Sequence, residues 1–232
     1  MTLFLFPNLL SDEGDHRDFL PASVDRAVST IDGLIAESEK GARAYLRRFS
    51  FSAPKTFRDI PIRLLNEHTR SEELVDLLSP LLKGETWGLI SDCGLPCLAD
   101  PGATLVKQAR EKGIKIEAFV GPSSLILALM LSGLPAQRFA FHGYLDRDPR
   151  KQISHLEKRA KEEKATQLFI EAPYRSQKLL EQLIATLSSS TMLCVAWDLT
   201  MPSQQVISQS VAKWKIGPTP ILEKHPTVFL IY

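Results

Sequence analysis

The residues best suited to chemistry lie in one loop, at residues 91–102, and in a short segment at residues 121–124. The loop reads Ser-Asp-Cys-Gly-Leu-Pro and then, after one residue pair, Ala-Asp-Pro-Gly, while the second segment reads Gly-Pro-Ser-Ser. Carboxylates form charge-assisted hydrogen bonds with ammonium groups, and glycine lets a ligand approach the backbone closely. The pattern favours a pocket for a polar ligand over a turn between packed elements.

Apolar runs predict the strands that must hold these two segments. Residues 86–90 precede the loop, residues 115–120 precede the second segment, and a helical pattern at residues 101–112 lies between them. Strands that alternate with helices are typical of parallel sheets with right-handed crossovers. Ligands of open α/β sheets bind beyond the carboxyl ends of the strands, where both segments are expected.

The same patterns divide the rest of the chain into elements. Further strands are expected at residues 3–6, 33–36, 167–171, 192–197 and 228–232, and further helices at residues 72–82, 123–132, 146–164 and 176–187. Asp100 is expected as the N-cap of the helix at residues 101–112, with Pro101 in its first position. We place the domain boundary near Gly121, which gives an N-terminal α/β domain at residues 1–120 and a C-terminal α/β domain at residues 121–232.

Composition and charge exclude several classes of protein. The 232 residues are 44% hydrophobic, as in ordinary globular domains, and the formal net charge of +1 gives no overall nucleic-acid signature. Three cysteines without a Cys-x-x-Cys pair indicate neither a disulfide framework nor a metal site, and we expect them to be small buried thiols. The longest apolar run, at residues 125–131, is far shorter than the roughly 20 residues that span a bilayer. We therefore expect a cytoplasmic protein with no metal and no membrane association.

One stretch, at residues 43–63, is locally basic. Asp59 is its only acid, and its cations are Arg43, Arg47, Arg48, Lys55, Arg58 and Arg63. Aromatic residues are interleaved with these cations, and they are Tyr45, Phe49, Phe51 and Phe57. Cations attract phosphates and aromatic rings stack unpaired bases, so the stretch predicts an RNA-binding surface in which Arg43 and Arg47 contact the substrate. The alternative is a solvated helix face above core aromatics.

His68 is a further candidate for substrate binding. It follows Asn66 and Glu67 after an apolar pair, and an imidazole exchanges a proton near neutral pH. A single histidine is more often structural, so both interpretations stay open.

Taken in order, these segments resemble the tetrapyrrole methylase family of S-adenosylmethionine (SAM) methyltransferases. The resemblance is to the branch of ribosomal small subunit methyltransferase I, a ribose 2′-O-methyltransferase. Besides the two segments above, matching motifs stand in the same order at residues 35–37, 65–68, 141–144, 169–175 and 194–200. The resemblance covers nearly the whole chain. It implies two α/β domains with a SAM cleft between them, and a homodimer.

The resemblance also implies which residues contact SAM. They are Pro7, Ser91, Asp92, Gly94, Leu95, Pro96, Ser123, Ser124, Ala196 and Pro226. Asp92 would accept a hydrogen bond from the methionine ammonium group, and backbone N–H groups near Gly94 would hold the methionine carboxylate. Ala196 and Pro226 would lie against the adenosine. No residue is assigned as the general base.

Two segments depart from the pattern of the family. Residues 6–12 lack the glycine of the family's Pro-Thr-Pro-Ile-Gly-Asn loop, and residues 36–40 read Ala-Glu-Ser-Glu-Lys in place of Ala-Glu-Asp-Thr-Arg. The cofactor half is therefore better preserved than the substrate half. We expect SAM-dependent methyl transfer to a ribose 2′-hydroxyl of ribosomal RNA. Methylation of a tetrapyrrole or other small molecule, and a non-catalytic SAM-binding protein, are the alternatives.

Overall fold

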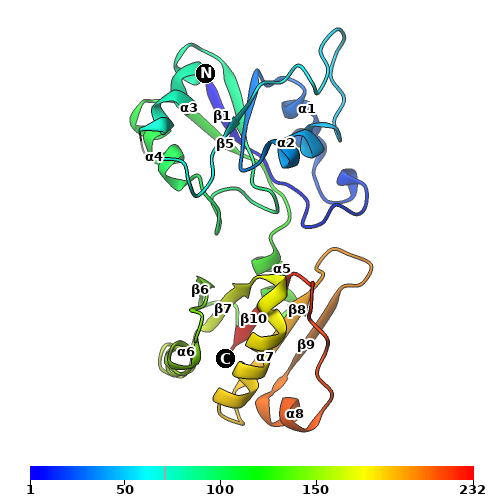
Figure 1. Ribbon diagram of the computed structural model, residues 1–232, viewed down its shortest axis with the longest axis vertical. Helices are drawn as coiled ribbons and strands as arrows, with labels where there is room; N and C mark the ends of the chain where they lie inside the picture. The colour runs from blue at the N-terminus through cyan, green and yellow to red at the C-terminus, as the bar shows by residue number, and fades with distance from the viewer. Residues whose placement is uncertain (71) are drawn as a thin grey trace. The chain divides into compact units, whose positions relative to one another are not determined.

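A computed structural model describes residues 1–70 and 72–232, and in it the chain forms two compact units (Figure 1). Unit 1 is Met1–Ser123 and unit 2 is Ser124–Tyr232. The boundary between the units falls between residues 123 and 124. The sequence pattern predicts it three residues earlier, between residues 120 and 121. Each unit is built on one five-stranded sheet.

The sheet of unit 1 is parallel throughout, in the order β3-β2-β4-β1-β5. Its strands are β1 (Thr2–Leu5), β2 (Gly33–Ala36), β3 (Ile62–Leu64), β4 (Thr86–Leu89) and β5 (Lys115–Ala118). The segments between them hold η1 (His16–Asp18), α1 (Ala22–Val28), α2 (Glu39–Leu46), α3 (Glu73–Leu82) and α4 (Ala103–Glu111).

Helices cover both faces of this sheet, which explains why its central strands are apolar along their whole length. Leu34 of β2 packs in a cluster with residues of α1 and α2. The next residue, Ile35, packs in a second cluster with residues of α3 and α4. Successive side chains of a strand point to opposite faces, so a strand buried on both sides reads as a continuous apolar run.

The order of the strands creates one position where neighbouring loops diverge. β1 and β4 are adjacent, yet the chain from β1 passes through α1 to β2, and the chain from β4 passes through α4 to β5 on the other side of β1. The loops after β1 and β4 therefore leave the sheet in opposite directions. Such a switch point leaves a crevice at the carboxyl edge, where ligands of open α/β sheets bind.

The sheet of unit 2 is mixed, so the expectation of parallel strands throughout the chain is wrong. Its order is β6-β7-β10-β8-β9, and only β6 and β7 pair in parallel. The strands are β6 (Phe139–Tyr144), β7 (Thr166–Glu171), β8 (Met192–Trp197), β9 (Gln205–Ser210) and β10 (Thr227–Ile231). The helices are α5 (Ser124–Ser132), α6 (Arg150–Glu163), α7 (Pro173–Thr186) and α8 (Val211–Ile216). No helix separates β8 from β9, so they form a hairpin, and β10 then inserts between β7 and β8.

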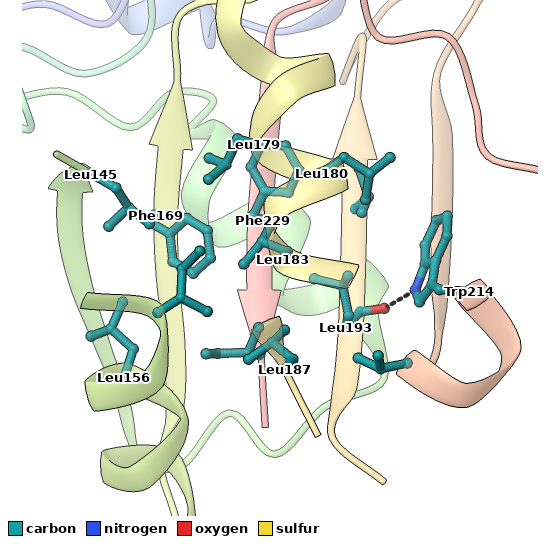
Figure 2. Packing of buried hydrophobic residues seen from close by; sticks show 14 of the residues in the cluster. Leu145, Leu156, Phe169, Leu179, Leu180, Leu183, Leu187, Leu193, Trp214 and Phe229 are labelled. Atoms are coloured by element: carbon teal, nitrogen blue, oxygen red, sulfur yellow. Dashed lines mark hydrogen bonds between the residues drawn. The ribbon is translucent and has the colours of Figure 1, made fainter. Parts of the chain in front are cut away.

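The core of unit 2 lies between its sheet and helices α6 and α7 (Figure 2). The rings of Phe169 and Phe229 stack there at 5.8 Å, and the indole N–H of Trp214 donates to the Leu193 carbonyl at 2.9 Å. Helix α5 packs on strands β8, β9 and β10 and contributes no residue to that cluster. Among the described residues, no helix is long and apolar enough to cross a membrane.

The predicted helix cap at Asp100 is also wrong. Helix α4 begins at Ala103, and Gly102 occupies the N-cap with φ of +141°. A Cβ at Gly102 would lie 2.6 Å from the sulfur of Cys97, so the turn requires glycine. The segment that contains Asp100 therefore lies in the loop after β4, outside the helix.

Candidate functional site

The loops that follow β1 and β4 are held together by Asn8, which is 4% exposed. The Asn8 side-chain amide donates to the backbone carbonyls of Ser91 and Asp92, both at 3.0 Å. The Asn8 backbone N–H donates to the Gly94 carbonyl at 2.7 Å, and the Gly94 N–H donates to the Leu9 carbonyl at 3.3 Å. A buried amide with its hydrogen bonds satisfied favours a single arrangement, so the two loops are fixed to each other.

The loop after β5 packs against the other two loops at positions that leave no room for a side chain. A Cβ at Gly121 would lie 2.1 Å from the Cβ of Pro7. Gly94 has φ of +73°, and a Cβ there would lie 3.3 Å from a side-chain carbon of Leu10 and 3.6 Å from the Pro122 carbonyl oxygen. Gly121 is needed because of this close approach, and Gly94 is favoured by its positive φ.

Unit 1 thus holds seven of the predicted SAM contacts in three packed loops. They are Pro7, Ser91, Asp92, Gly94, Leu95, Pro96 and Ser123. The Gly94 N–H already donates to Leu9, so it is not free to hold a ligand carboxylate. This removes one of the backbone donors that the resemblance suggests for the methionine carboxylate.

Asp92 contacts the N-terminus of α2 through the N-cap residue Ser38. Its carboxylate accepts a hydrogen bond from the Ser38 hydroxyl at 3.2 Å, and the same hydroxyl caps α2 by accepting from the Gly41 N–H at 3.0 Å. A Cβ at Gly41 would lie 2.3 Å from an Asp92 oxygen, so this approach also needs a glycine. Asp92 is nevertheless exposed. Its carboxylate has about four lone pairs, which leaves acceptor positions open to a ligand.

Two further carboxyl groups with raised pKa values lie at this edge. Glu37 follows β2 and accepts from the Asp92 N–H at 3.1 Å; burial, with the charge of Asp92, raises its pKa. Burial also raises the pKa of Asp100 to about 6, with the charge of Glu37 adding to the effect. The edge is therefore acidic, and a cationic ligand group would be stabilised there.

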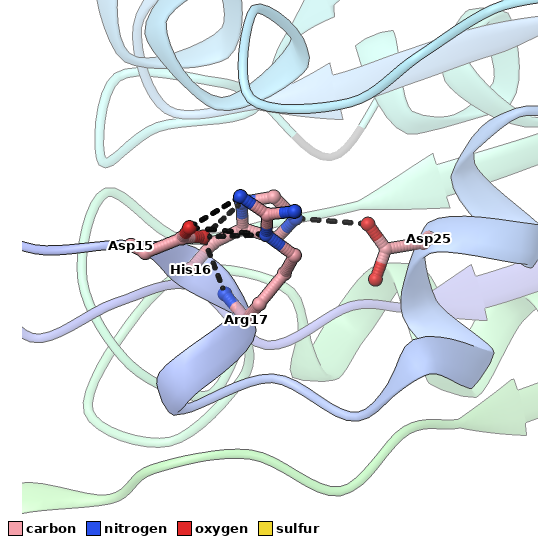
Figure 3. A network of polar contacts seen from close by, with 4 residues as sticks. All are labelled: Asp15, His16, Arg17 and Asp25. Carbon is pink, nitrogen blue, oxygen red and sulfur yellow. Dashed lines mark hydrogen bonds and ion pairs between the residues drawn. The ribbon is translucent and has the colours of Figure 1, made fainter.

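Side chains anchor the loop after β1 at its far end, around His16 (Figure 3). Nε2 of His16 lies 2.8 Å from an oxygen of Asp25 on α1, and Nδ1 lies 3.4 Å from an oxygen of Asp15. The ring also packs edge-on against Phe49 at 4.8 Å. Arg17 donates from Nε and Nη2 to Asp15, which lowers the pKa of Asp15 to about 2. Polar contacts thus fix a loop that lacks the family's glycine.

The remaining predicted SAM contacts belong to unit 2. Ala196 is buried in β8, Ser124 is the first residue of α5, and Pro226 is exposed just before β10. The Pro226 carbonyl accepts from the Asp198 N–H at 3.2 Å, and the buried Asp198 carboxylate lies 2.7 Å from Nδ1 of His225. These bonds connect the loop after β8 to the loop before β10, at one edge of the sheet.

Side-chain hydrogen bonds inside unit 1 engage four of the six cations in the basic stretch. Arg43 donates to the carbonyls of Phe57 and Ile60, at 3.0 and 2.9 Å. The other three hydrogen bonds are from Arg48 to the Asn8 side-chain oxygen at 2.8 Å, from Lys55 to the Ile31 carbonyl at 2.7 Å, and from Arg63 to the Ser79 hydroxyl at 3.3 Å. Arg43, expected to bind substrate, therefore also holds the loop that follows α2.

Arg47 and Arg58 are the two remaining cations. Both are exposed, and their guanidinium groups lie 5.7 and 5.4 Å from the centre of the Phe57 ring. Within the described part of the chain, neither side chain has a hydrogen-bond or ion-pair partner. Cation–π contacts at an exposed site are weak, at about 0.5–1 kcal/mol. Both groups are therefore available to a phosphate.

His68 lies apart from these groups, in the loop after β3. Its side chain is 85% exposed, and Nε2 lies 3.6 Å from a carboxylate oxygen of Glu67. No group of three His, Cys, Asp or Glu residues is arranged to hold a metal ion in residues 1–70 and 72–232. The cysteines are unpaired, and Cys93 is exposed rather than buried as expected.

Sequence reasoning missed the residues that assemble the site. Asn8 connects the loops and Gly41 lets Asp92 approach α2, and neither was singled out; Arg48 was expected on an RNA-binding surface but bonds to Asn8. The available signal was the polar Asn8 directly after a strand and Pro7, since a buried polar side chain there needs partners.

Comparison with known proteins now identifies the kind of protein. The family described as Tetrapyrrole (Corrin/Porphyrin) Methylases matches residues 20–214. The chain belongs to the tetrapyrrole methylase family. It is therefore a methyltransferase by descent, as the motifs predict, and the family implies the use of SAM.

Individual sequences agree with this membership. The chain is 32% identical over 214 residues to ribosomal RNA small subunit methyltransferase I of Xylella fastidiosa strain Temecula1, covering 91% of this chain and 73% of that protein. It is 28% identical over 211 residues to the protein of the same name from Vibrio cholerae serotype O1, covering 91% and 69%.

Solved structures of tetrapyrrole methylase-like proteins have the same fold. Diphthine synthase matches with a TM-score of 0.65 and 17% identity, over 99% of this chain and 89% of that chain. The methyltransferase CobJ matches with a TM-score of 0.64 and 15% identity, over 99% and 92%. The predicted tetrapyrrole methylase-like α/β fold is confirmed.

Replacing Asp100 by Asn is expected to change how the stability of the protein depends on pH. With a pKa of about 6, folded Asp100 keeps a proton that the unfolded chain loses near pH 4. The free energy of unfolding therefore falls as the pH rises from about 4 to about 6, and this effect is constant above that range. Asp100→Asn has no such group, so its stability relative to the wild type should increase through this window. Urea denaturation across the pH range measures the difference.

Asp59→Asn provides a control of opposite sign. Hydrogen bonds from Thr56 lower the pKa of Asp59, so this carboxylate stabilises the folded state above its unfolded pKa. The Asp59→Asn variant should lose stability relative to the wild type as the pH rises through about 4. Parallel curves for Asp100→Asn and wild type between about pH 4 and 6 would contradict the assignment.

Proposed function

We propose that this methyltransferase transfers a methyl group from SAM to a ribose 2′-hydroxyl of small-subunit ribosomal RNA. The main support is sequence similarity, along 91% of the chain, to proteins named ribosomal RNA small subunit methyltransferase I. The exposed Arg47 and Arg58 beside Phe57 add independent support for an RNA substrate. Cytoplasmic location and a homodimer remain predictions.

The carboxyl edge of unit 1 fits the methionine end of SAM. Asp92 presents an exposed carboxylate to an ammonium group, and Glu37 and Asp100 add negative charge beside it. Asn8 and Gly94 keep the loops in place, so the cofactor finds a pre-formed surface. We propose that Ser124, Ala196 and Pro226 of unit 2 complete the binding of SAM.

Positioning is the main task of these residues. When bound, SAM would supply a methyl group on its sulfonium sulfur. The acceptor oxygen would bond to the methyl carbon while the carbon–sulfur bond on the opposite side breaks, and S-adenosylhomocysteine would leave. Fixing the donor and the acceptor in one geometry lowers the barrier because the entropy of alignment is lost on binding, before the reaction. The acceptor hydroxyl also needs a proton acceptor, and no residue is assigned to that role.

The function is tested by asking which acceptor gains a methyl group. Purified protein is incubated with SAM labelled in its methyl group and, separately, with ribosomal RNA, small ribosomal subunits and a pool of tetrapyrroles. We expect label in the RNA fraction, in a nucleotide resistant to alkaline hydrolysis because its 2′-oxygen is methylated. Label in a tetrapyrrole, or SAM binding without transfer to any acceptor, would overturn the proposal in favour of the small-molecule or non-catalytic alternative.

Asp92→Asn is expected to weaken SAM binding by about tenfold or more. A hydrogen bond to a charged group contributes roughly 1.5–3 kcal/mol, and about 1.4 kcal/mol corresponds to a factor of ten. Calorimetric titration with SAM and thermal denaturation are measured on the same sample. If Asp92 serves only to hold Ser38, affinity would be unchanged while the melting temperature falls.

Gly94→Val is the companion variant for the loop itself. A branched side chain is strained at φ of +73° and meets Leu10, so SAM binding should weaken even though Asp92 is intact. Gly113→Val is the matched control, because Gly113 also has positive φ but nothing lies within 4 Å of its Cβ position. Equal affinities for SAM in the two variants would show that the packing of Gly94 is unimportant.

The basic stretch should divide into two functional classes. Arg47→Glu with Arg58→Glu should lower RNA affinity and flatten its dependence on salt, while leaving SAM affinity and stability unchanged. Arg43→Ala should instead lower the free energy of unfolding. The backbone carbonyls of Phe57, Arg58 and Ile60 would each lose the guanidinium donor. Filter binding over a salt series and urea denaturation separate these effects. RNA binding by the double variant equal to that of the wild type would exclude the Arg47–Phe57–Arg58 surface.

A further inference from the structure

A second basic site lies in unit 2, beside the start of α7. A hollow of about 240 Å³ is lined by Arg147, Glu171, Arg175, Lys178, Leu179 and Gln182. This volume is about eight times the roughly 30 Å³ that one water molecule occupies in the liquid. The hollow therefore has room for a phosphate group with its attached sugar.

Three of the lining residues are cations and one is an acid, so an excess of positive charge faces the hollow. Arg175 and Lys178 stand three residues apart on α7 and share one face of that helix. Arg147 comes from the segment before α6. Within residues 1–70 and 72–232, Arg147 and Lys178 are exposed and have no hydrogen-bond or ion-pair partner. The guanidinium group of Arg147 and the ammonium group of Lys178 are thus free to bind an anion.

The acid that lines the hollow, Glu171, has a carboxylate oxygen that accepts no hydrogen bond from the described residues. The Glu171 side chain is 1% exposed, and one of its oxygens accepts from the Ala172 N–H at 2.8 Å. Its other oxygen, Oε2, lies 3.0 Å from an Arg175 nitrogen but accepts no hydrogen bond with proper geometry. That Arg175 nitrogen instead donates to the Asp146 carbonyl at 3.2 Å. The ion pair with Arg175 offsets part of the cost of burying this carboxylate, and Oε2 keeps an acceptor position that a ligand hydroxyl could use.

Free cations at the rim and a buried acceptor below them match the two polar parts of one ribonucleotide unit. We propose that this hollow binds a backbone phosphate of the RNA substrate through Arg147 and Lys178, and the adjoining ribose 2′-hydroxyl through Oε2 of Glu171. A 2′-hydroxyl distinguishes RNA from DNA, so the site would contribute to the choice of nucleic acid. The identification of the ligand as substrate RNA rests on the proposed function, whereas the phosphate chemistry rests on the residues of the hollow alone.

The phosphate contact is tested by charge reversal. Arg147→Glu with Lys178→Glu should lower the affinity for a short single-stranded RNA by on the order of tenfold and reduce the slope of its salt dependence by about one. Lys213→Glu with Lys215→Glu is the matched control, since both lysines are exposed on α8 of the same unit and do not line the hollow. Calorimetry with SAM confirms that the cofactor site is intact. Equal losses of RNA affinity in the two double variants would overturn the proposal, because general charge would then explain them.

The ribose contact is tested by comparing RNA with DNA of the same sequence. The wild type should bind the RNA several-fold more tightly, as expected from one hydrogen bond. Glu171→Ala should reduce this preference, whereas Glu171→Gln, which keeps an acceptor oxygen, should retain it; thermal denaturation confirms that both variants are folded. If the wild type shows no preference, or if the preference is unchanged in Glu171→Ala, the ribose contact is wrong.

Inorganic phosphate separates an RNA site from a site for a free anion. It should compete with the RNA only weakly. If inorganic phosphate binds as tightly as the RNA and DNA binds equally well, the hollow is a free-anion site and the RNA proposal is overturned. None of these measurements uses methyl transfer. A protein that passes them but methylates no RNA would therefore contradict the proposed function alone.

Discussion

The geometry of the candidate site depends on the side chain of Asn8. Its amide donates to two carbonyls of the loop after β4, and its oxygen accepts from the Leu9 N–H and from Arg48. All four contacts are made at a position that is nearly inaccessible to water. Because unpaired polar groups are costly there, the alternatives to this arrangement are high in free energy. The switch point between β1 and β4 brings the two loops to one edge of the sheet, and Asn8 fixes their arrangement there.

The sequence predicts the central strands of both sheets but not three of the four edge strands. β3, β6 and β9 were not predicted, and each lies at the edge of its sheet. Ile62–Leu64 is three residues long with an arginine at its centre, and four of the six residues of Gln205–Ser210 are polar. Edge strands are paired on one side only and are often short or polar, so they lack the apolar run by which buried strands are recognised. The helices α1, α2 and α8 were also missed. They are seven, eight and six residues long, so the helical period has little room to repeat within them.

The sequence predicts which segments form the candidate site, but not which partners their side chains contact. The loop at residues 91–96 and the segment at residues 121–124 were found because glycine, proline and acids cluster there. The division of the basic stretch was not predictable, because Arg43 on α2 and Arg47 directly after that helix are the same residue type, four residues apart. They differ in what lies beside them: three backbone carbonyls for Arg43 and the Phe57 ring for Arg47. Such differences depend on contacts between residues distant along the chain, which local patterns do not record.

The position of β10 has a consequence for how the protein is made. Unit 1 can pair all its strands once the ribosome has released β5, which ends at Ala118. In unit 2 the last strand along the chain, Thr227–Ile231, lies in the middle of the sheet and pairs with both β7 and β8. Nascent unit 2 therefore leaves the facing edges of β7 and β8 unpaired until residues 227–231 have emerged from the ribosome, whereas unit 1 has all its strands earlier. Any pause in translation before that point would leave those edges open to other chains and to chaperones.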